Sequence, residues 1–167
     1  MERVYIGLGS NLADPQQQLR GALQALAELP GSRLAAVSSL YASDPLGPAD
    51  QPRYVNAVAA LETDLEPLAL LDALQRIELA QGRERKAERW GPRTLDVDII
   101  DIEGYTSDAP ELIVPHPYAH ERAFVLIPWL AADGGARLSG EGVAKRVVAL
   151  DPQERADIRR LGMMEEL

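Results

Sequence analysis

The fold is decided by residues 94–100, which read Thr94-Leu95-Asp96-Val97-Asp98-Ile99-Ile100. Acidic and aliphatic side chains alternate as far as Ile99, and this period of two is typical of a β-strand whose successive side chains point to opposite faces. Asp96 and Asp98 therefore share one face, with their Cβ atoms roughly 7 Å apart. The aliphatic residues beside them are expected to enter a core on the other face.

Two carboxylates on one face of a strand suit a magnesium site. Hard oxygen ligands prefer hard cations, and this pair can hold one Mg²⁺ or bridge two ions roughly 3.5 to 4 Å apart. Just before the strand, Gly91-Pro92 forms a rigid turn and leaves Arg93 nearby, where its planar guanidinium can bind two phosphate oxygens. The alternative is a solvated strand face. The two arginines within 89–93 favour the metal and phosphate interpretation.

Composition excludes several classes of protein. With 167 residues the chain fits one domain. Its net charge of -9 argues against binding to nucleic acid or to anionic membranes, which favour a basic face. The apolar run 123–132 contains Pro128 and has about half the length that a bilayer requires. The absence of cysteine agrees with a reducing cytosol, so we expect a cytoplasmic protein that binds neither nucleic acid nor a membrane.

Hydrophobic periodicity predicts alternating strands and helices. Asp14 is expected to cap the first helix, and Pro15 suits its first position. The order βαββαβ is typical of an α+β, ferredoxin-like sandwich with helices on one sheet face and the active site on the other. The expected strands are 4–8, 33–42, 54–63 and 94–102, and the expected helices are 15–28 and 66–80.

The rest of the chain is expected to add to this core without forming a second domain. A loop over 103–110 leads to a short strand, 112–114. We predict a single domain over 1–167, with a core of about 3–130 and a C-terminal helical cover over 131–167, in which 143–150 and 153–161 are the candidate helices.

Seven groups of residues resemble, in order along the chain, the motifs of the 6-hydroxymethyl-7,8-dihydropterin pyrophosphokinase family. They are Gly9-Ser10-Asn11, 41–47, 51–56, Gln75-Arg76-Ile77-Glu78, 82–98, Pro115-His116 and 120–124, and the resemblance extends from Tyr5 to about Pro128. Members of that family transfer a diphosphoryl group from ATP to a pterin alcohol in folate biosynthesis and release AMP. The resemblance implies the same reaction here, with two Mg²⁺ ions and with ATP and 6-hydroxymethyl-7,8-dihydropterin as substrates. We expect the protein to be a monomer.

The resemblance also implies roles for the charged residues around the aspartate strand. Asp96 and Asp98 would hold the two Mg²⁺ ions, and Arg83 and Arg93 would be the catalytic residues that stabilise the diphosphoryl group. Arg83 has an alternative role, because a cation at the C-terminal end of a helix is favoured by the helix dipole. ATP contacts are implied for Gln75, Arg85, Trp90, Arg93, Ile99, His116 and Arg122.

Two helical positions and one histidine have structural alternatives. Gln75 and Glu78 lie three residues apart on one helical face. That face can equally be solvated, and Glu78 can equally be a structural partner. A lone histidine is often structural, but His116 lies on a loop fixed by two prolines, and the resemblance favours a ligand role.

The resemblance places the pterin against an aromatic and an amide. A flat heteroaromatic ring needs an aromatic side chain to stack on, and an amide can read its edge as both donor and acceptor. Asn56 in the middle of a strand is costly unless it is paired, which favours function. Phe124 has the alternative of a plain core aromatic. The implied pterin contacts are Tyr54, Asn56 and Phe124, with backbone groups of Ser43, Asp44 and Leu46.

Two other functions fit part of the sequence. A palm-type nucleotidyltransferase also sets two aspartates on a strand, but its Gly-Ser element should lie shortly before them, whereas Gly9-Ser10 lies far upstream. That enzyme would release pyrophosphate. A ferredoxin-like regulatory module explains the fold but has no need for two arginines and two aspartates together. The sequence contains no Walker-type P-loop, which excludes ordinary P-loop kinase chemistry.

Overall fold

The computed structural model describes residues 1–11, 14–43, 53–82 and 95–162. Strands and helices alternate along its first two thirds, largely as the sequence predicts. The elements are β1 (Glu2–Ser10), α1 (Pro15–Ala27), β2 (Ser32–Val37), β3 (Leu40–Ser43), β4 (Tyr54–Thr63), α2 (Pro67–Gly82) and β5 (Leu95–Ile102).

The predicted strand 33–42 is wrong in one respect, because it is two strands separated by Ser38 and Ser39. The Ser38 hydroxyl accepts the backbone N–H of Val58 at 3.0 Å and donates to the Ser39 carbonyl at 2.7 Å. The serine hydroxyl thus forms hydrogen bonds with backbone groups that would otherwise bond to each other between paired strands. The interruption lets β2 and β3 pair with different parts of β4.

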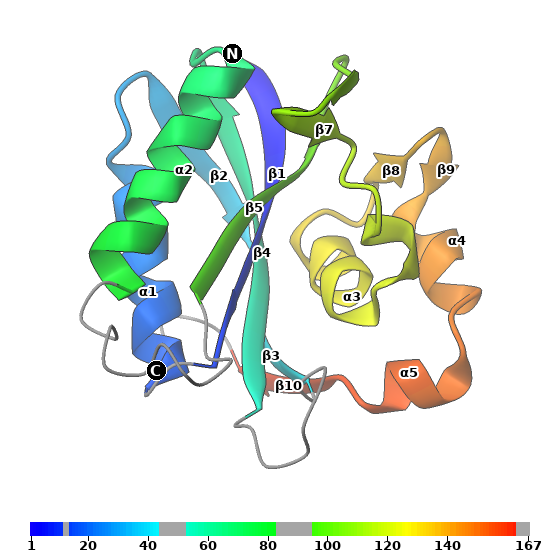
Figure 1. The fold of residues 1–167 in the computed structure, drawn as a ribbon. Coiled ribbons are helices and arrows are strands. Elements are labelled where there is room, and N and C mark those ends of the chain that lie inside the picture. Colours follow the sequence, from blue (N-terminus) through cyan, green and yellow to red (C-terminus); the bar gives the residue numbers. More distant parts are fainter. Residues whose placement is uncertain (12–13, 44–52, 83–94, 163–167) are drawn as a thin grey trace.

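The main sheet is antiparallel at every described pairing and has the order β10-β3-β4-β1-β5, with β2 also paired to β4. In this order β1 lies between β4 and the aspartate strand β5 (Figure 1). The first strand is therefore flanked on both sides by strands that carry predicted site residues.

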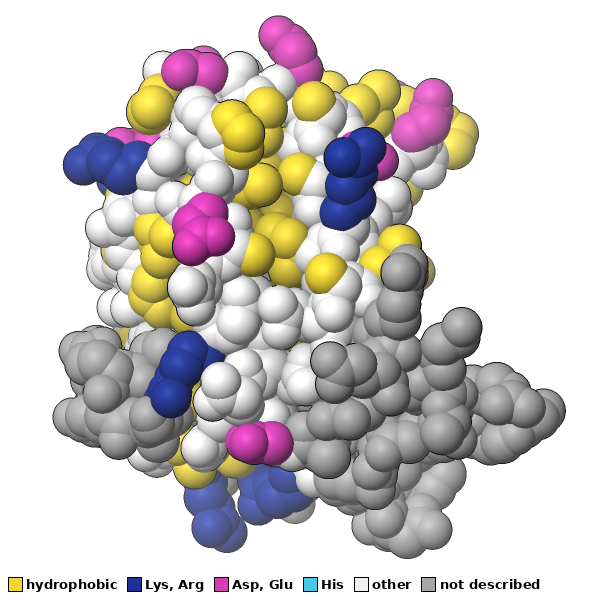
Figure 2. All heavy atoms as spheres, turned by 90° about the vertical axis from the view of Figure 1, so that its left-hand side faces the viewer, with side chains coloured by type: hydrophobic (Ala, Val, Ile, Leu, Met, Phe, Trp, Pro, Cys, Tyr) yellow, Lys and Arg dark blue, Asp and Glu magenta, His cyan; other side chains and the backbone are white. Residues whose placement is uncertain are grey.

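Helices α1 and α2 cover one face of this sheet (Figure 1). Leucines of α1 at positions 19, 23 and 26 meet Leu70, Leu74 and Ile77 of α2 and the aliphatic residues of β1, β4 and β5 in one core. Asp14 stands at the predicted N-cap position, but its side chain makes no capping hydrogen bond, and the residue has a left-handed φ of 56°. The outer surface of this layer mixes charged and hydrophobic side chains (Figure 2).

Helices also lie on the second face of the sheet, which the prediction assigned to the active site. Helices α3 (Ala123–Ala132) and α4 (Val143–Val148) lie on the second face, where Trp129 packs against Tyr5 with ring centroids 5.1 Å apart. The sequence of α3, AFVLIPWLAA, is apolar all round, and such a helix is stable only when it is buried. The cover is partial, so part of the second face stays open beside the start of α3.

The chain end also differs from the predicted helical cover. The segment 153–161 contains a short helix followed by β10, which pairs with β3 as an outer strand of the main sheet, and the predicted loop 103–110 contains β6. None of the helices in the described ranges is long and apolar enough to span a membrane. The remaining elements are β6 (Ser107–Ala109), β7 (Leu112–Val114), η2 (Ala119–Glu121), β8 (Arg137–Leu138), β9 (Glu141–Gly142), α5 (Pro152–Ala156) and β10 (Arg159–Gly162).

Candidate active site

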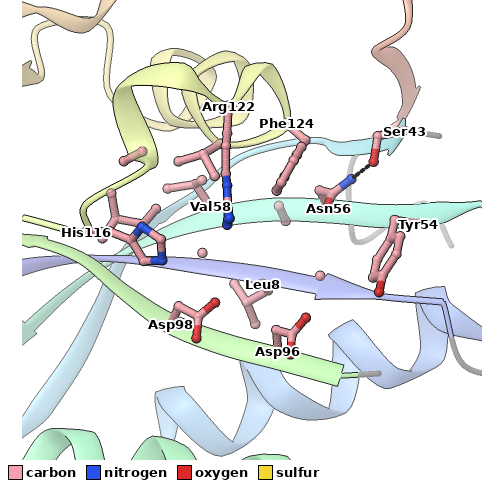
Figure 3. Close-up of a pocket in the computed structure, with 16 residues that line it drawn as sticks. Leu8, Ser43, Tyr54, Asn56, Val58, Asp96, Asp98, His116, Arg122 and Phe124 are labelled. Atoms are coloured by element: carbon pink, nitrogen blue, oxygen red, sulfur yellow. Dashed lines mark hydrogen bonds between the residues drawn. The ribbon is translucent and has the colours of Figure 1, made fainter. Parts of the chain in front are cut away.

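A cavity of about 170 Å³ opens on the second face of the sheet, over β4, β1 and β5 and under the start of α3 (Figure 3). It brings together residues that are far apart in the sequence. Eight of the predicted site residues line it: Ser43, Tyr54, Asn56, Asp96, Asp98, His116, Arg122 and Phe124.

The two aspartates of β5 project into one side of the cavity (Figure 3), as the alternation of residues predicts. Partial burial raises the pKa of Asp98 to about 6, and the neighbouring charge of Asp96 adds to this effect. Both causes disfavour the ionised form of Asp98 next to the Asp96 carboxylate unless a cation is bound. The described residues contain no group of three acidic, histidine or cysteine side chains that could hold a metal. A Mg²⁺ ion here would complete its shell with water or substrate oxygens, as this ion usually does.

A β-bulge in β5 positions His116. The pairing with β1 shifts between Ile6, opposite Ile99, and Tyr5, opposite Asp101, so Ile100 is the extra residue. Its carbonyl accepts the backbone N–H of His116 at 2.8 Å. Bulges commonly redirect a strand next to an active site. This one fixes the loop after β7 at the aspartate side of the cavity.

His116 is held as a neutral hydrogen-bond donor. Its Nδ1 accepts the backbone N–H of Tyr118 at 3.1 Å, which leaves the ring proton on Nε2. Burial and, to a smaller extent, the charge of Arg122 hold the pKa of His116 below its usual value. The imidazole and Asp98 both line the cavity (Figure 3), so the Nε2–H group is available to an oxygen of a ligand there.

Arg122 supplies positive charge opposite the aspartates. Its guanidinium carbon lies 5.4 Å from the ring centroid of Tyr118 and 5.6 Å from that of Phe124. These cation–π contacts hold the side chain so that it extends from the start of α3 toward the β5 side (Figure 3). A planar guanidinium in this place is suited to phosphate oxygens.

The other side of the cavity is an amide beside two aromatic rings. The side-chain amide of Asn56 donates to the Ser43 hydroxyl at 2.7 Å, and both residues are buried, with 4% and 5% exposure. Tyr54 and Phe124 stand near Asn56 in Figure 3. A flat ligand can stack on these rings while the carboxamide oxygen of Asn56 reads its edge.

Some predicted contacts are not in the cavity. Gln75 is exposed on α2, and the side chain of Ile99 is buried in the core on the helix side of the sheet. A contact between Ile99 and a ligand on the second face would have to use its backbone. Both roles stay predictions. Six predicted residues lie outside the described ranges: Asp44, Leu46, Arg83, Arg85, Trp90 and Arg93.

The structure adds cavity residues that the sequence did not single out. Gly7, Val58 and Ile100 line the cavity, as does Gly9, which the sequence marks only as part of a motif. The two glycines could be assigned to the site only from the strand register, which places Gly7 and Gly9 directly opposite the two aspartates. A single sequence does not give that register.

The cavity has the groups that a metal-dependent phosphoryl-transfer enzyme with a flat organic acceptor needs. They are a carboxylate pair, an arginine and a neutral histidine, next to a surface of aromatic and amide side chains. The sequence profile described as 7,8-dihydro-6-hydroxymethylpterin-pyrophosphokinase (HPPK) matches residues 5–134. The chain therefore belongs to this family.

Individual relatives agree with this assignment. A 2-amino-4-hydroxy-6-hydroxymethyldihydropteridine pyrophosphokinase of Pseudomonas aeruginosa is 62% identical over 128 residues, covering 77% of this chain and 78% of that protein. A protein of the same name from Methylorubrum extorquens is 41% identical over 152 residues, covering 91% and 96%.

The solved structures support the fold. A triple mutant of HPPK-DHPS from Plasmodium falciparum, with pteroate, matches with a TM-score of 0.72 and 11% identity. The match covers 95% of this chain but 46% of that one, so the chain spans about half the length of this relative. At such identity the likeness shows the fold alone, a mixed α/β arrangement around an antiparallel sheet.

Proposed function

We propose that this chain transfers a diphosphoryl group from ATP to the hydroxymethyl oxygen of 6-hydroxymethyl-7,8-dihydropterin and releases AMP. Family membership gives the class of reaction: the chain is a pyrophosphokinase of folate biosynthesis. One observation supports the assignment of both substrates: within one cavity, a surface of amide and aromatic side chains faces a carboxylate pair. These are the groups that a pterin ring and a metal-bound triphosphate need.

Asp96 and Asp98 are proposed to hold two Mg²⁺ ions. When bound, the ions neutralise charge on the phosphates and on the attacking oxygen, as phosphoryl transfer requires. The donor set fits, because the two carboxylates lie on one face of β5, the described residues offer no group of three such ligands, and Mg²⁺ commonly takes its remaining ligands from substrate and water.

Arg122 and His116 are proposed to bind the triphosphate. The guanidinium and the Nε2–H group both donate from fixed positions, so they can orient the chain of phosphates toward the aspartates. The hydroxymethyl oxygen then attacks the β-phosphorus, and its proton passes to water. The bond from that phosphorus to the α,β-bridging oxygen breaks, and AMP leaves. Arg83 and Arg93 keep their predicted catalytic roles, and Gln75, Arg85, Trp90, Arg93 and Ile99 keep their predicted ATP contacts.

The pterin is proposed to lie between Asn56 and the aspartates. Asn56 reads its edge, and Tyr54 and Phe124 flank its rings, which orients the hydroxymethyl group toward β5. The backbone groups of Ser43, Asp44 and Leu46 complete the predicted contacts.

We also propose a single domain over 1–167 with a ferredoxin-like core of about 3–130, acting as a cytoplasmic monomer. The strand order β3-β4-β1-β5, with α1 and α2 on one face, supports the ferredoxin-like interpretation of the core.

The nucleotide product tests the proposed function. The protein is incubated with ATP, Mg²⁺ and 6-hydroxymethyl-7,8-dihydropterin, and the products are separated by chromatography. We expect AMP in equal amount to the diphosphorylated pterin, and none above background in a control without the pterin. ADP would indicate transfer of one phosphoryl group, and pyrophosphate would indicate a nucleotidyltransferase; either product would contradict the proposal.

A further inference from the structure

The central strand of the cavity floor, β1, has glycines at two successive positions on the face of the sheet that the cavity occupies. Along β1 the residues Ile6 and Leu8 enter the core under the helices, so the alternate positions face the second side of the sheet. Tyr5 fills the first of these positions, under α3. The next two positions on that face are Gly7 and Gly9, and both line the cavity.

The strand register sets these glycines between the two halves of the site. Gly9 pairs with Asn56 of β4 on one side and with Asp96 of β5 on the other. Neighbouring strands lie about 4.8 Å apart, so Asn56 and Asp96 are separated by about 9.6 Å of bare backbone. Figure 3 shows the aspartates and Asn56 on opposite sides of this strand.

A methyl group at Gly9 would meet an atom of a side chain that is held in place by burial and a hydrogen bond. A Cβ built on Gly9 lies 3.0 Å from Oδ1 of Asn56, closer than ordinary van der Waals contact. The other end of that carboxamide is tied to Ser43 at 2.7 Å, and the residue is buried. The amide therefore has to shift by a few tenths of an ångström, and its hydrogen bond to Ser43 opposes that shift.

The same methyl group at Gly7 meets a softer neighbour. Its Cβ would lie 3.2 Å from Cδ1 of Ile100, the tip of a flexible side chain. A rotation about the last torsion of Ile100 relieves that contact. The two glycines thus differ in what a side chain would disturb.

We propose that Gly9 is a specificity-determining residue for the flat heteroaromatic substrate. It keeps the carboxamide oxygen of Asn56 in the position from which it can hydrogen-bond to the edge of the ring. This proposal rests on the proposed function, because it takes the pterin as the ring. Gly7 widens the same floor but does not set the position of the amide.

The test is the binding of 6-hydroxymethyl-7,8-dihydropterin to Gly9→Ala, measured by calorimetry with Mg²⁺ and a saturating non-hydrolysable ATP analogue. We expect pterin affinity to fall by on the order of 10-fold or more, because a displaced polar group is costly in a binding site. Affinity for the ATP analogue should stay within about twofold, which also shows that the variant is folded. Gly134→Ala is the matched control, since a Cβ there meets nothing within 4 Å. Gly7→Ala should lose less than Gly9→Ala.

A double-mutant cycle separates the amide from a direct clash with the substrate. Asn56→Ala removes the atom that the new methyl would meet, so adding Gly9→Ala in that background should change pterin affinity by no more than about twofold. An equal loss in both backgrounds, or unchanged pterin affinity in Gly9→Ala, would overturn the role of Gly9. So would an equal loss of pterin and nucleotide affinity. Failure of the wild-type protein to bind the pterin would instead overturn the proposed function.

Discussion

The carboxylate of Glu78 accepts the backbone N–H of Val97 at 2.7 Å, at the one residue of β5 that separates Asp96 from Asp98. Glu78 belongs to α2, on the helix side of the sheet, and β5 is the last strand of the described sheet order. Burial raises the pKa of Glu78 to about 7, although the hydrogen bond from Val97 opposes this shift. The helix thus holds the edge strand at the residue between the two predicted metal ligands.

We predict that Glu78→Ala raises the Mg²⁺ concentration needed for half-maximal activity by roughly 10-fold or more, in the range found when groups that orient metal ligands are removed. Glu78→Gln should keep most of the wild-type response, because its carbonyl oxygen can accept the same N–H. The measurement is the initial rate across a magnesium titration at saturating substrates. Leu79→Ala, on the exposed side of the same helix, is the control. Equal behaviour of the alanine and glutamine variants would rule out positioning through this hydrogen bond.

We predict that Asp96→Asn and Asp98→Asn each lower the turnover number by ~10²-fold or more, as does the removal of a preorganised electrostatic group from an active site. Each substitution keeps the shape of the side chain, so the melting temperature should change little. Asp101→Asn is the matched control, because Asp101 lies on the same strand but does not line the cavity. Wild-type turnover by either variant at saturating Mg²⁺ would mean that the carboxylate belongs to a solvated strand face.

Local periodicity was enough to predict the elements that carry the site. The alternation around Asp96 and Asp98 gave β5 and its two faces, and the leucine spacing of α1 gave the buried side of that helix. Strand β4 has the predicted bounds. Each of these signals lies within one element, so no long-range information was needed.

The rest depends on pairings between distant segments. The break at Ser38 comes from a hydroxyl bonded to Val58 on another strand, and the bulge at Ile100 comes from the register with β1. Strand β10 has a polar, exposed sequence and becomes a strand only because the edge of β3 accepts it. Its residues carry no periodic apolar pattern that could predict this.

We predict that His116 titrates below its ordinary pKa near 6.5 and is a neutral Nε2–H tautomer at pH 7. Because the folded pKa is lowered, the unfolded chain binds the proton first, so this residue makes the fold less stable as pH falls below about 6.5. Nitrogen-detected NMR across pH checks the tautomer, with His120→Gln used to assign the two histidines. Arg122→Gln should raise the His116 pKa, whereas Arg122→Lys, which keeps the charge, should not. A pKa unchanged in both variants would mean that burial alone sets the shift.

A hydrogen bond between the Tyr5 hydroxyl and the Asp133 carboxylate connects the second face of the sheet to the end of α3. The Tyr5 hydroxyl donates to Oδ2 of Asp133 at 2.7 Å, and Arg3 lies 3.4 Å from the same oxygen. The hydrogen bond from Tyr5 is the largest cause that holds the pKa of Asp133 below its usual value. None of these three residues lines the cavity.

We predict that Tyr5→Phe lowers the free energy of unfolding by about 1 to 2 kcal/mol at pH 7, the range for a hydrogen bond to a partly exposed charged group, and leaves catalysis unchanged. Because the folded pKa of Asp133 is lowered, its contribution is present above the unfolded pKa of about 3.9 and is lost as pH falls through the folded value. The difference between wild type and Tyr5→Phe should therefore shrink at pH 3. Urea unfolding at pH 7 and pH 3 measures both values, with Tyr105→Phe, an exposed tyrosine, as the control. A difference that is the same at both pH values would show that the lost hydroxyl acts through packing and not through the Asp133 carboxylate.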